Sequence, residues 1–181
     1  DCLSQASYVI ADESTKRAVV VDPRRDVSPY LETAEEHGLT IELVLETHFH
    51  ADFLSGHLEL AAATGAEIGY GDVAVTEFES RGFADGERYS LGDVTLEIRH
   101  TPGHTPESIS IVVYEHADDE TPYAVLTGDT MFIGDVGRPD LLSSIGVTAD
   151  ELAGQLYDSL HEQLLTPVSY THLTLPTTGV V

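Results

Sequence analysis

Apolar and polar positions alternate along this chain in short blocks that are typical of strands. Apolar runs predict strands at Tyr8–Ile10, Ala18–Val21, Ile41–Leu45, Val94–Ile98, Ile109–Tyr114 and Tyr123–Leu126. All but one of these runs are predominantly apolar, which favours strands that are buried on both faces. The run Val94–Ile98 alternates instead, as a half-buried strand does.

Three helices are expected, at residues 28–37, about 55–64 and 148 to about 165. Ser28 followed by Pro29 is typical of an N-cap and a first helical residue. A glycine directly follows each of the first two helices, as at a C-cap. Thr148 and Glu151 have the spacing of a capping box, which predicts the start of the third helix. With no internal repeat and no low-complexity linker, the pattern predicts one α/β domain, mostly strands with a few helices.

The composition is that of a folded domain with a strongly acidic surface. Of the 181 residues, 41% are hydrophobic and 22% are charged, which is close to the globular average and excludes wholesale disorder. The 32 acidic residues outnumber the 8 basic ones, for a formal net charge of -24. This charge repels phosphate backbones and anionic lipids, so nucleic-acid and membrane partners are not expected. An ordinary solvated surface and adaptation to high salt both fit the acidic excess.

Cysteine content and the lack of long apolar runs bear on the compartment. Cys2 is the only cysteine, so no internal disulfide forms, which favours a reducing environment. No apolar run reaches the length of a membrane span, and no basic segment followed by an apolar one opens the chain. We therefore expect a cytoplasmic protein. The chain begins at Asp1 rather than at Met, so we expect its start to be processed or incomplete.

The last residues differ from the rest of the chain. The segment 168–177, VSYTHLTLPT, has no acidic or basic residue in a chain rich in carboxylates. An edge strand is one interpretation. We favour a non-native tail over residues 168–181, because one back-translation of the segment is similar to a transposon-derived sequencing adapter. The domain is then expected over residues 1–167, incomplete at both ends, and His172 is excluded from the site.

The segment ETHFHADFLSGH follows the apolar strand Ile41–Leu45 and contains the potential metal ligands His48, His50 and Asp52. Residues two apart in an extended segment point to the same face, at a place where a rigid strand passes into a loop. Two imidazoles and a carboxylate in this position favour a metal site over histidines that only hydrogen-bond within a polar turn.

Two later segments supply the same ligand types at the ends of further strands. In HTPGHTP, a turn forced by Pro102 and Gly103 presents His104. In YAVLTGD, a buried strand ends at Asp129. Three strand ends thus deliver two imidazoles and one carboxylate. This set is the facial triad of non-haem Fe(II) oxygen chemistry, and it also fits part of a dinuclear zinc hydrolase site.

The motifs THFHAD, TPGHT and TGD, in this order, resemble those of the metallo-β-lactamase superfamily. Within it, ETHFHADFLSGHLELA and GDTMFIGDVGRPDL are similar to the persulfide dioxygenases, or sulfur dioxygenases, and to their bacterial branch often fused to rhodanese domains. The resemblance covers about residues 3–166 and extends to the related glyoxalase II branch. It implies an αββα sandwich, truncated at the C-terminus, and a metal-dependent oxidoreductase of sulfur metabolism.

Position 53 bears on the number of metals. Dinuclear hydrolases of the superfamily, such as glyoxalase II, have a histidine after the aspartate of this motif, where this chain has Phe53. Phenylalanine cannot bind a metal, so the second metal site loses a ligand. One metal held by His48, His104 and Asp129 is the simpler expectation, and it matches what the dioxygenase resemblance implies.

The remaining polar residues near the motifs have expected supporting roles. His50 and Asp52 are expected to orient the ligands or to hydrogen-bond bound water. By resemblance, Arg138 contacts the thiol substrate, and a guanidinium suits a carboxylate such as that of glutathione. A structural turn clamp between Arg138 and Asp135 or Asp140 is the alternative.

Two other segments are given no role in the site. We expect His57 to start the second helix and to cap or pack there, rather than to replace a metal ligand. The segment DPRRD at 22–26 follows a buried strand, and the family has a similar loop near the site. We interpret it as a solvated turn.

The resemblance implies a mononuclear non-haem Fe(II) persulfide dioxygenase with one iron per chain. It would oxidise a low-molecular-weight persulfide, expected to be glutathione persulfide, with O2 to sulfite and thiol. A homodimer and a fused rhodanese domain in the intact protein stay open as partners. The alternatives are a zinc-dependent thioester hydrolase of the glyoxalase II type, against which Phe53 counts, and a metal-binding fragment without catalytic activity.

Overall fold

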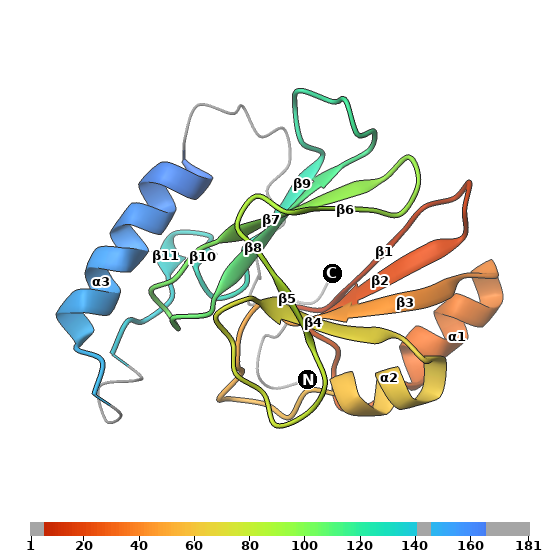
Figure 1. Ribbon diagram of the computed structural model, residues 1–181, viewed down its shortest axis with the longest axis horizontal. Coiled ribbons are helices and arrows are strands. Elements are labelled where there is room, and N and C mark those ends of the chain that lie inside the picture. The colour runs from red at the N-terminus through yellow and green to blue at the C-terminus, as the bar shows by residue number, and fades with distance from the viewer. Residues whose placement is uncertain (1–5, 141–145, 166–181) are drawn as a thin grey trace.

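The structure is a computed structural model that describes residues 6–140 and 146–165. Two β-sheets lie face to face, and helices cover the outer side of each sheet (Figure 1). The layers follow the order αββα, which confirms the expected α/β sandwich. The expected non-native tail at 168–181, with His172, lies outside the described residues.

The first sheet is mixed, and its strands in order are β1 (Tyr8–Ala11), β2 (Arg17–Val21), β3 (Thr40–Leu45), β4 (Glu67–Gly71) and β5 (Arg81–Phe83). The strands β1 and β2 pair antiparallel, whereas β2 to β5 run parallel. Parallel neighbours need crossover connections; α1 (Ser28–His37) connects β2 to β3, and α2 (His57–Thr64) connects β3 to β4. The carboxyl ends of β2, β3 and β4 therefore meet at one edge of the sheet.

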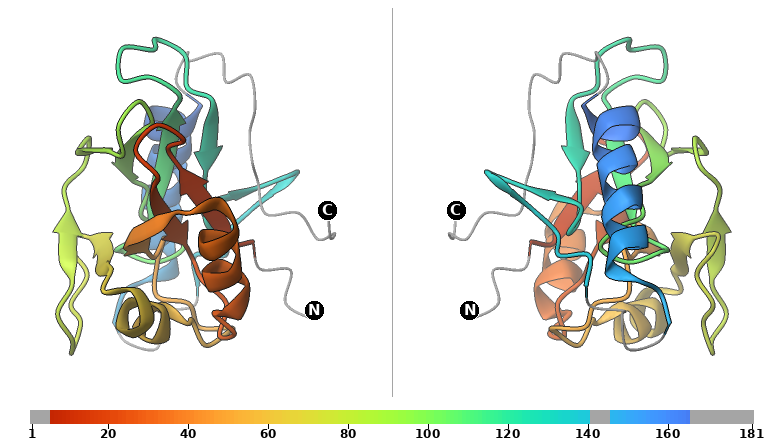
Figure 2. Two further views of the ribbon diagram at one scale, coloured as in Figure 1. Left: turned by 90° about the vertical axis from the view of Figure 1, so that its right-hand side faces the viewer. Right: turned by 90° about the vertical axis from the view of Figure 1, so that its left-hand side faces the viewer.

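The second sheet is antiparallel throughout, and its strands in order are β6 (Arg88–Ser90), β7 (Thr95–His100), β8 (Ile109–Tyr114) and β9 (Ala124–Leu126). A small hairpin of β10 (Met131–Phe132) and β11 (Asp135–Val136) follows β9. The helix α3 (Ala149–Asp158) continues as a π-helix, η2 (Ser159–Leu164), on the outer side of this sheet (Figure 2).

Alternation along the strands produces separate apolar layers. Along β2, Val19 and Val21 face the opposite sheet, whereas Ala18 and Val20 face the helices. Apolar side chains of α1 and α2 cover this helical side of the first sheet. Leu164 of η2 covers the outer side of the second sheet. The buried residues between the sheets are Val19, Val21, Leu43, Leu45, Phe83, Leu91, Leu96, Ile98, Ile109, Ile111, Val113, Ala124 and Leu126.

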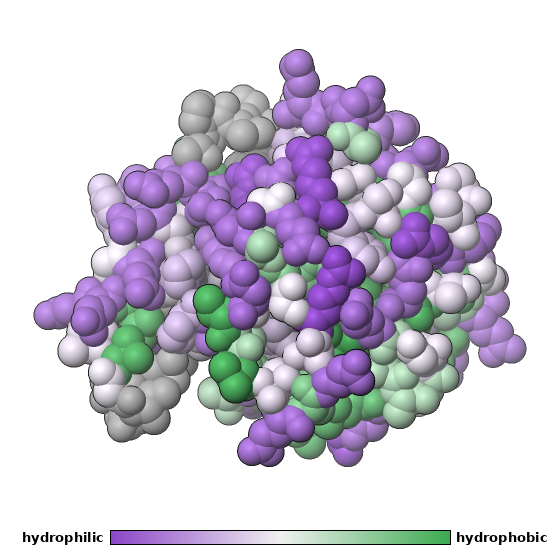
Figure 3. All heavy atoms as spheres, in the orientation of Figure 1, coloured by the Kyte–Doolittle hydropathy of each residue, from purple (hydrophilic) through white to green (hydrophobic). Residues whose placement is uncertain are grey.

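The surface reflects the acidic composition. Hydrophilic residues dominate the face shown in Figure 3, in keeping with the net charge of -24. Several of the few basic residues form ion pairs with this acidic excess, such as Arg81 with Glu87 and Arg88 with Glu97. Within residues 6–140 and 146–165, no helix has the length and apolar content to cross a membrane.

Most expected elements are present, with small shifts at their ends. Gly38 and Gly65 end α1 and α2 in the left-handed conformation, at φ of 64° and 76°. Thr148 and Glu151 form the expected capping box at the start of α3. Local signals of capping and apolar periodicity thus identify these helices correctly.

Other details of the prediction are wrong. Ser28 is not the N-cap of α1: the helix begins at Ser28, its cap is Val27, and the Asp26 carboxylate accepts a hydrogen bond from the Ser28 amide. The short strands β4, β5 and β6 lack a sequence signal. In β4, a Cβ at Gly69 would lie 2.6 Å from the Phe83 ring, so the glycine there serves packing.

Gly103 lies in the turn between β7 and β8, directly before His104. Its φ is 141°, which side chains rarely tolerate, and a Cβ would lie 2.4 Å from Cβ and 2.5 Å from Cα of Leu156. The turn therefore packs against the backbone of α3 without room for a methyl group. This contact fixes the segment that carries His104.

We predict that Gly103→Ala lowers the free energy of unfolding by about 1–3 kcal/mol, because the added methyl strains the turn and pushes on α3. Gly154→Ala is the matched control. Gly154 is exposed in α3, and no atom lies near the position of a Cβ there, so alanine at this position is expected to raise the free energy of unfolding by about 0.5–1 kcal/mol. Chemical denaturation of both variants measures the difference, and equal stabilities would contradict the packing argument.

Candidate metal centre

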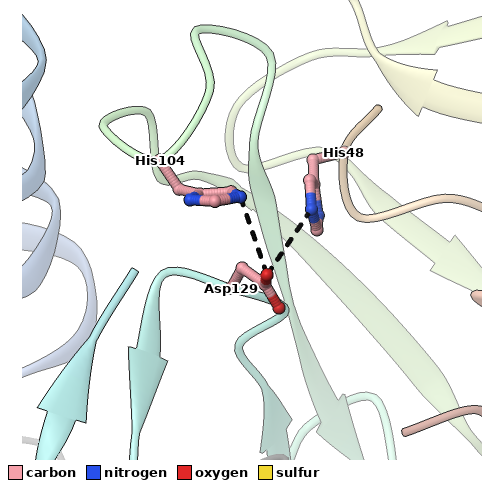
Figure 4. Close-up of side chains that lie close together, drawn as sticks. All are labelled: His48, His104 and Asp129. Atoms are coloured by element: carbon pink, nitrogen blue, oxygen red, sulfur yellow. Dashed lines mark ion pairs between the residues drawn. The ribbon is translucent and has the colours of Figure 1, made fainter. Parts of the chain in front are cut away.

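Three strand ends bring His48, His104 and Asp129 together (Figure 4). His48 follows β3, His104 lies between β7 and β8, and Asp129 follows β9. The Nε2 atoms of His48 and His104 lie 3.9 and 3.6 Å from Oδ2 of Asp129. One ligand atom from each residue lies within 4.8 Å of the other two. The structure thus groups the three residues that the sequence predicts as metal ligands.

Hydrogen bonds between the two halves of the sandwich hold these strand ends. The first amide of β8 donates to the carbonyl of Thr47 at 2.8 Å. The Phe49 amide donates to the buried carboxylate of Glu107 at 2.9 Å. The loop that carries His48 is therefore fixed by the segment that carries His104.

A backbone carbonyl orients His104. Its Nδ1 lies 3.1 Å from the carbonyl oxygen of Arg138. Because a carbonyl only accepts hydrogen bonds, Nδ1 carries a proton, and Nε2 is the ring nitrogen that faces Asp129 and is available to a metal. Arg138 thus acts on the site through its backbone.

Asp22 orients His48 through Thr47. The Thr47 hydroxyl donates to Oδ2 of Asp22 at 2.8 Å, which leaves its oxygen free to accept from Nδ1 of His48 at 3.0 Å. Nε2 of His48 then also presents a lone pair towards Asp129. Burial and the charges of the neighbouring histidines hold the pKa of His48 well below its usual range. The neutral imidazole is the form that binds metals.

The donor set fits a first-row divalent metal. Ligands about 2.1 Å from such a metal lie roughly 3.0–3.4 Å apart in octahedral or tetrahedral geometry. The observed separations of 3.6 and 3.9 Å require only a small contraction. Burial raises the pKa of the Asp129 carboxyl, although the charges of His104 and His50 oppose this shift. A divalent cation at this point would favour the ionised carboxylate.

His50 does not join this group. Its Nε2 lies 3.0 Å from Oδ1 of Asp22 and 3.5 Å from Oε2 of Glu46. Burial lowers the pKa of His50, but the hydrogen bond and charge of Asp22 and the charge of Glu46 outweigh it, so the pKa lies above its ordinary value. Burial and the charge of Asp22 raise the pKa of Glu46 to about 8, with His50 and Ser55 opposing.

The other residues singled out from the sequence lie around the centre. Asp52 is exposed, and its charge contributes to the raised pKa of Asp129. The Phe53 ring lies 4.3 Å from the His50 ring. The exposed Arg138 guanidinium pairs with Asp140 through Nε at 2.8 Å and an Nη atom at 2.9 Å. The turn clamp with Asp140 is thus present, and substrate binding by Arg138 stays a prediction.

His57 has the structural role expected of it. It is the first residue of α2, and its ring packs 5.2 Å from the ring of Phe78. It belongs to neither group of residues with metal-ligand spacing within the described part of the chain.

The sequence interpretation missed Asp22, Glu46 and Glu107. The reading of residues 22–26 as a solvated turn is wrong at Asp22, which is only 4% exposed. One signal was available, because Asp22 directly follows β2 as the motif with His48 follows β3, and parallel neighbouring strands end at the same edge. Glu46 and Glu107 are buried by contacts between strands that the sequence pattern does not specify.

We predict that the protein retains one divalent metal per chain after dialysis. His48→Ala and Asp129→Ala each remove a ligand, so metal affinity should fall by at least about 100-fold. His116→Ala is the control, since this histidine is exposed after β8 and pairs with Asp119. Elemental analysis of the dialysed proteins gives the metal content. Two tightly bound metals in the unmodified protein, or full metal content in both ligand variants, would contradict this assignment.

The raised pKa of Glu46 predicts a pH dependence of stability in the metal-free protein. A carboxyl whose pKa rises to about 8 on folding keeps its proton in the folded chain and loses it in the unfolded chain between about pH 4.5 and 8. The free energy of unfolding should therefore fall as pH rises through this range. Glu46→Gln imitates the neutral carboxyl, so the fall should be shallower by on the order of 1–3 kcal/mol.

The control for this prediction is Glu36→Gln, which removes the same formal charge from an exposed position of α1. Denaturation at pH 5 and pH 8 compares the two variants with the unmodified chain. A Glu46→Gln profile parallel to that of Glu36→Gln would show that the Glu46 carboxyl is ionised in the folded protein at pH 8.

Comparison with known proteins identifies relatives with two different activities. The hydroxyacylglutathione hydrolase of Rhodospirillum rubrum is 33% identical over 157 residues, which are 86% of this chain and 55% of that protein. The human mitochondrial persulfide dioxygenase ETHE1 is 28% identical over 162 residues, which are 88% of this chain and 58% of that protein. The chain thus spans a little over half the length of these two relatives.

A solved structure and a family model agree with the fold. The crystal structure of ETHE1 from Myxococcus xanthus matches with a TM-score of 0.79 and 30% identity, over 97% of this chain and 72% of that one. The model of the metallo-beta-lactamase superfamily matches residues 1–172, nearly the whole sequence. Together with the αββα sandwich and the grouped histidines and carboxylate, this match shows that the chain belongs to the metallo-β-lactamase superfamily.

Proposed function

We propose that this protein is a mononuclear non-haem Fe(II) persulfide dioxygenase. It oxidises a low-molecular-weight persulfide, with glutathione persulfide as the expected substrate, and releases sulfite and thiol. The observation that carries this proposal is the ligand set. Two histidines and one carboxylate converge on one point, while His50 is turned away and Phe53 replaces a ligand of the second metal. Two imidazoles and one carboxylate with open positions are the donor set of non-haem Fe(II) oxygenases.

The residues of the chain hold and orient the metal. His48, His104 and Asp129 would bind it, and Thr47 and the Arg138 carbonyl fix the two imidazole rings. Iron bound there would supply the positions at which O2 and the persulfide sulfur meet. The overall reaction, R–S–SH + O2 + H2O → R–SH + SO3²⁻ + 2 H⁺, balances without another reductant, because the terminal sulfur gives up the four electrons that O2 takes.

Arg138 is the proposed contact for a substrate carboxylate. Its guanidinium is 67% exposed, and its partner Asp140 is 51% exposed. An ion pair this exposed contributes little free energy, so a carboxylate of glutathione can replace Asp140 at small cost. The backbone carbonyl of Arg138 contacts the His104 ring, and this proximity in the chain supports a role of Arg138 near the metal centre.

A zinc-dependent thioester hydrolase of the glyoxalase II type is the second candidate. The 33% identical hydroxyacylglutathione hydrolase favours it. The lack of a ligand at Phe53 and the orientation of His50 weaken it, because both remove donors that a two-metal site would use. A chain that binds metal without catalysis is the third outcome, since the chain spans about half of several relatives.

The test is a pair of assays on the protein loaded anaerobically with Fe(II) and, separately, with Zn(II). The proposal predicts O2 uptake with glutathione persulfide and one sulfite per O2 in the iron form, lost in Asp129→Ala. Arg138→Ala should raise KM for glutathione persulfide by about 10-fold with kcat nearly unchanged, as loss of a substrate contact does. Hydrolysis of a hydroxyacylglutathione thioester by the zinc form, without O2 uptake by the iron form, would favour the hydrolase instead.

A further inference from the structure

His50 is adjacent to the metal centre but is anchored away from it. Its ring centre lies 4.1 Å from that of His48, so a rotation of the side chain would bring it towards the same point. Instead, its Nε2 lies 3.0 Å from Asp22 and 3.5 Å from Glu46. The group with metal-ligand spacing at the centre contains His48, His104 and Asp129 without His50.

The two carboxylates that hold His50 are themselves rigidly fixed. Asp22 accepts hydrogen bonds from the amide and the hydroxyl of Thr47, both at 2.8 Å, and its own amide donates to the last carbonyl of β3 at 3.0 Å. Glu46 accepts from the Ser55 hydroxyl at 2.6 Å, and its amide donates to Gly69 at 3.0 Å. Backbone contacts of neighbouring strands therefore determine where both carboxylates lie.

The backbone of Asp22 has a strained conformation. Its φ is 49°, one of two positive values at non-glycine residues in the described parts of the chain. Aspartate tolerates this conformation better than most residues, but it still costs free energy. This conformation places the buried Asp22 carboxylate against Thr47 and His50. The strained residue is therefore part of a fixed polar contact and not of a loose turn.

The Nε2 atom of His50 cannot contact a carboxylate and bind the metal at the same time. Nε2 of His50 either donates its proton to a carboxylate or presents a lone pair to a metal. While the Nε2 proton of His50 points towards Asp22 and Glu46, this nitrogen does not bind the metal. A third imidazole on the metal would fill one of the positions that a two-histidine, one-carboxylate site leaves open for ligands.

We propose that Asp22 and Glu46 are positioning residues that keep His50 off the metal and so limit the centre to two imidazoles. This inference rests on the metal centre in the proposed function, but not on the reaction catalysed there. The two carboxylates thereby decide how many coordination positions stay open. Their loss would convert the centre into one with three histidines.

The test counts imidazoles on the metal. The protein is labelled with ¹⁵N-histidine and loaded with Zn(II) as a diamagnetic probe, and long-range ¹H–¹⁵N correlation spectra distinguish metal-bound ring nitrogens from free ones. The unmodified chain should show two bound imidazoles. Asp22→Ala/Glu46→Ala should show three, and adding His50→Gln to this double variant should return the count to two.

Two control variants isolate the role of His50. Asp12→Ala removes a buried carboxylate that bonds the turn after β1 and belongs to neither group with metal-ligand spacing among the described residues, so the count should stay at two. His50→Gln alone should also leave two bound imidazoles and leave Zn(II) affinity within about threefold of the unmodified value. This variant keeps the proposal testable if the double variant does not fold.

Three results would overturn the inference. The first is a third bound imidazole in the unmodified chain, and the second is a count of two in a folded double variant. The third is metal bound by His50 with Asp22 and Glu46, which also have metal-ligand spacing. A count of zero in the unmodified chain would overturn the metal centre itself. Two bound imidazoles without dioxygenase activity would refute only the proposed reaction and support the positioning role.

Discussion

The buried carboxylate of Asp22 is the contact on which the site depends. It accepts hydrogen bonds from the amide and hydroxyl of Thr47 and lies within hydrogen-bonding distance of His50. A buried charge is costly unless its lone pairs are satisfied, so the groups around Asp22 are confined to the orientations that satisfy it. Through Thr47 this constraint fixes the tautomer of His48, and directly it fixes the ring of His50.

The centre also requires both sheets. His48 and its supporting carboxylate come from the first sheet, whereas His104 and Asp129 come from the second. The apolar layer between the sheets brings these edges together, and cross-sheet hydrogen bonds such as that from Phe49 to Glu107 set their register. Apolar burial supplies the general driving force for this packing, and the polar contacts at the edge make the arrangement specific.

Much of this architecture can be predicted from local patterns in the sequence. The long apolar strands, the C-cap glycines and the capping box at Thr148 are local signals, and each is found where it was expected. The ligand motifs were recognisable because each follows an apolar strand. Their spatial convergence then follows from the family fold that the motifs indicate.

The structural features that the sequence did not predict depend on contacts between segments that are distant in the chain. Asp22 lies in a polar run that reads as solvated, and only its parallel neighbour β3 buries it. The strand β4 was not predicted, and the glycine at position 69 is explained only by the ring of Phe83 that packs against it. The orientation of His50 is not encoded in the HxHxD pattern, because it depends on Asp22, which lies 28 residues away in the sequence.

The central claim is a single metal on two imidazoles and one carboxylate. A crystal structure of the iron-loaded protein, with an anomalous difference map at the iron edge, tests it most directly. One peak is expected about 2.0–2.2 Å from Nε2 of His48, Nε2 of His104 and a carboxylate oxygen of Asp129, with His50 still hydrogen-bonded to Asp22. A second peak near Asp52, or a peak within bonding distance of His50, would contradict it.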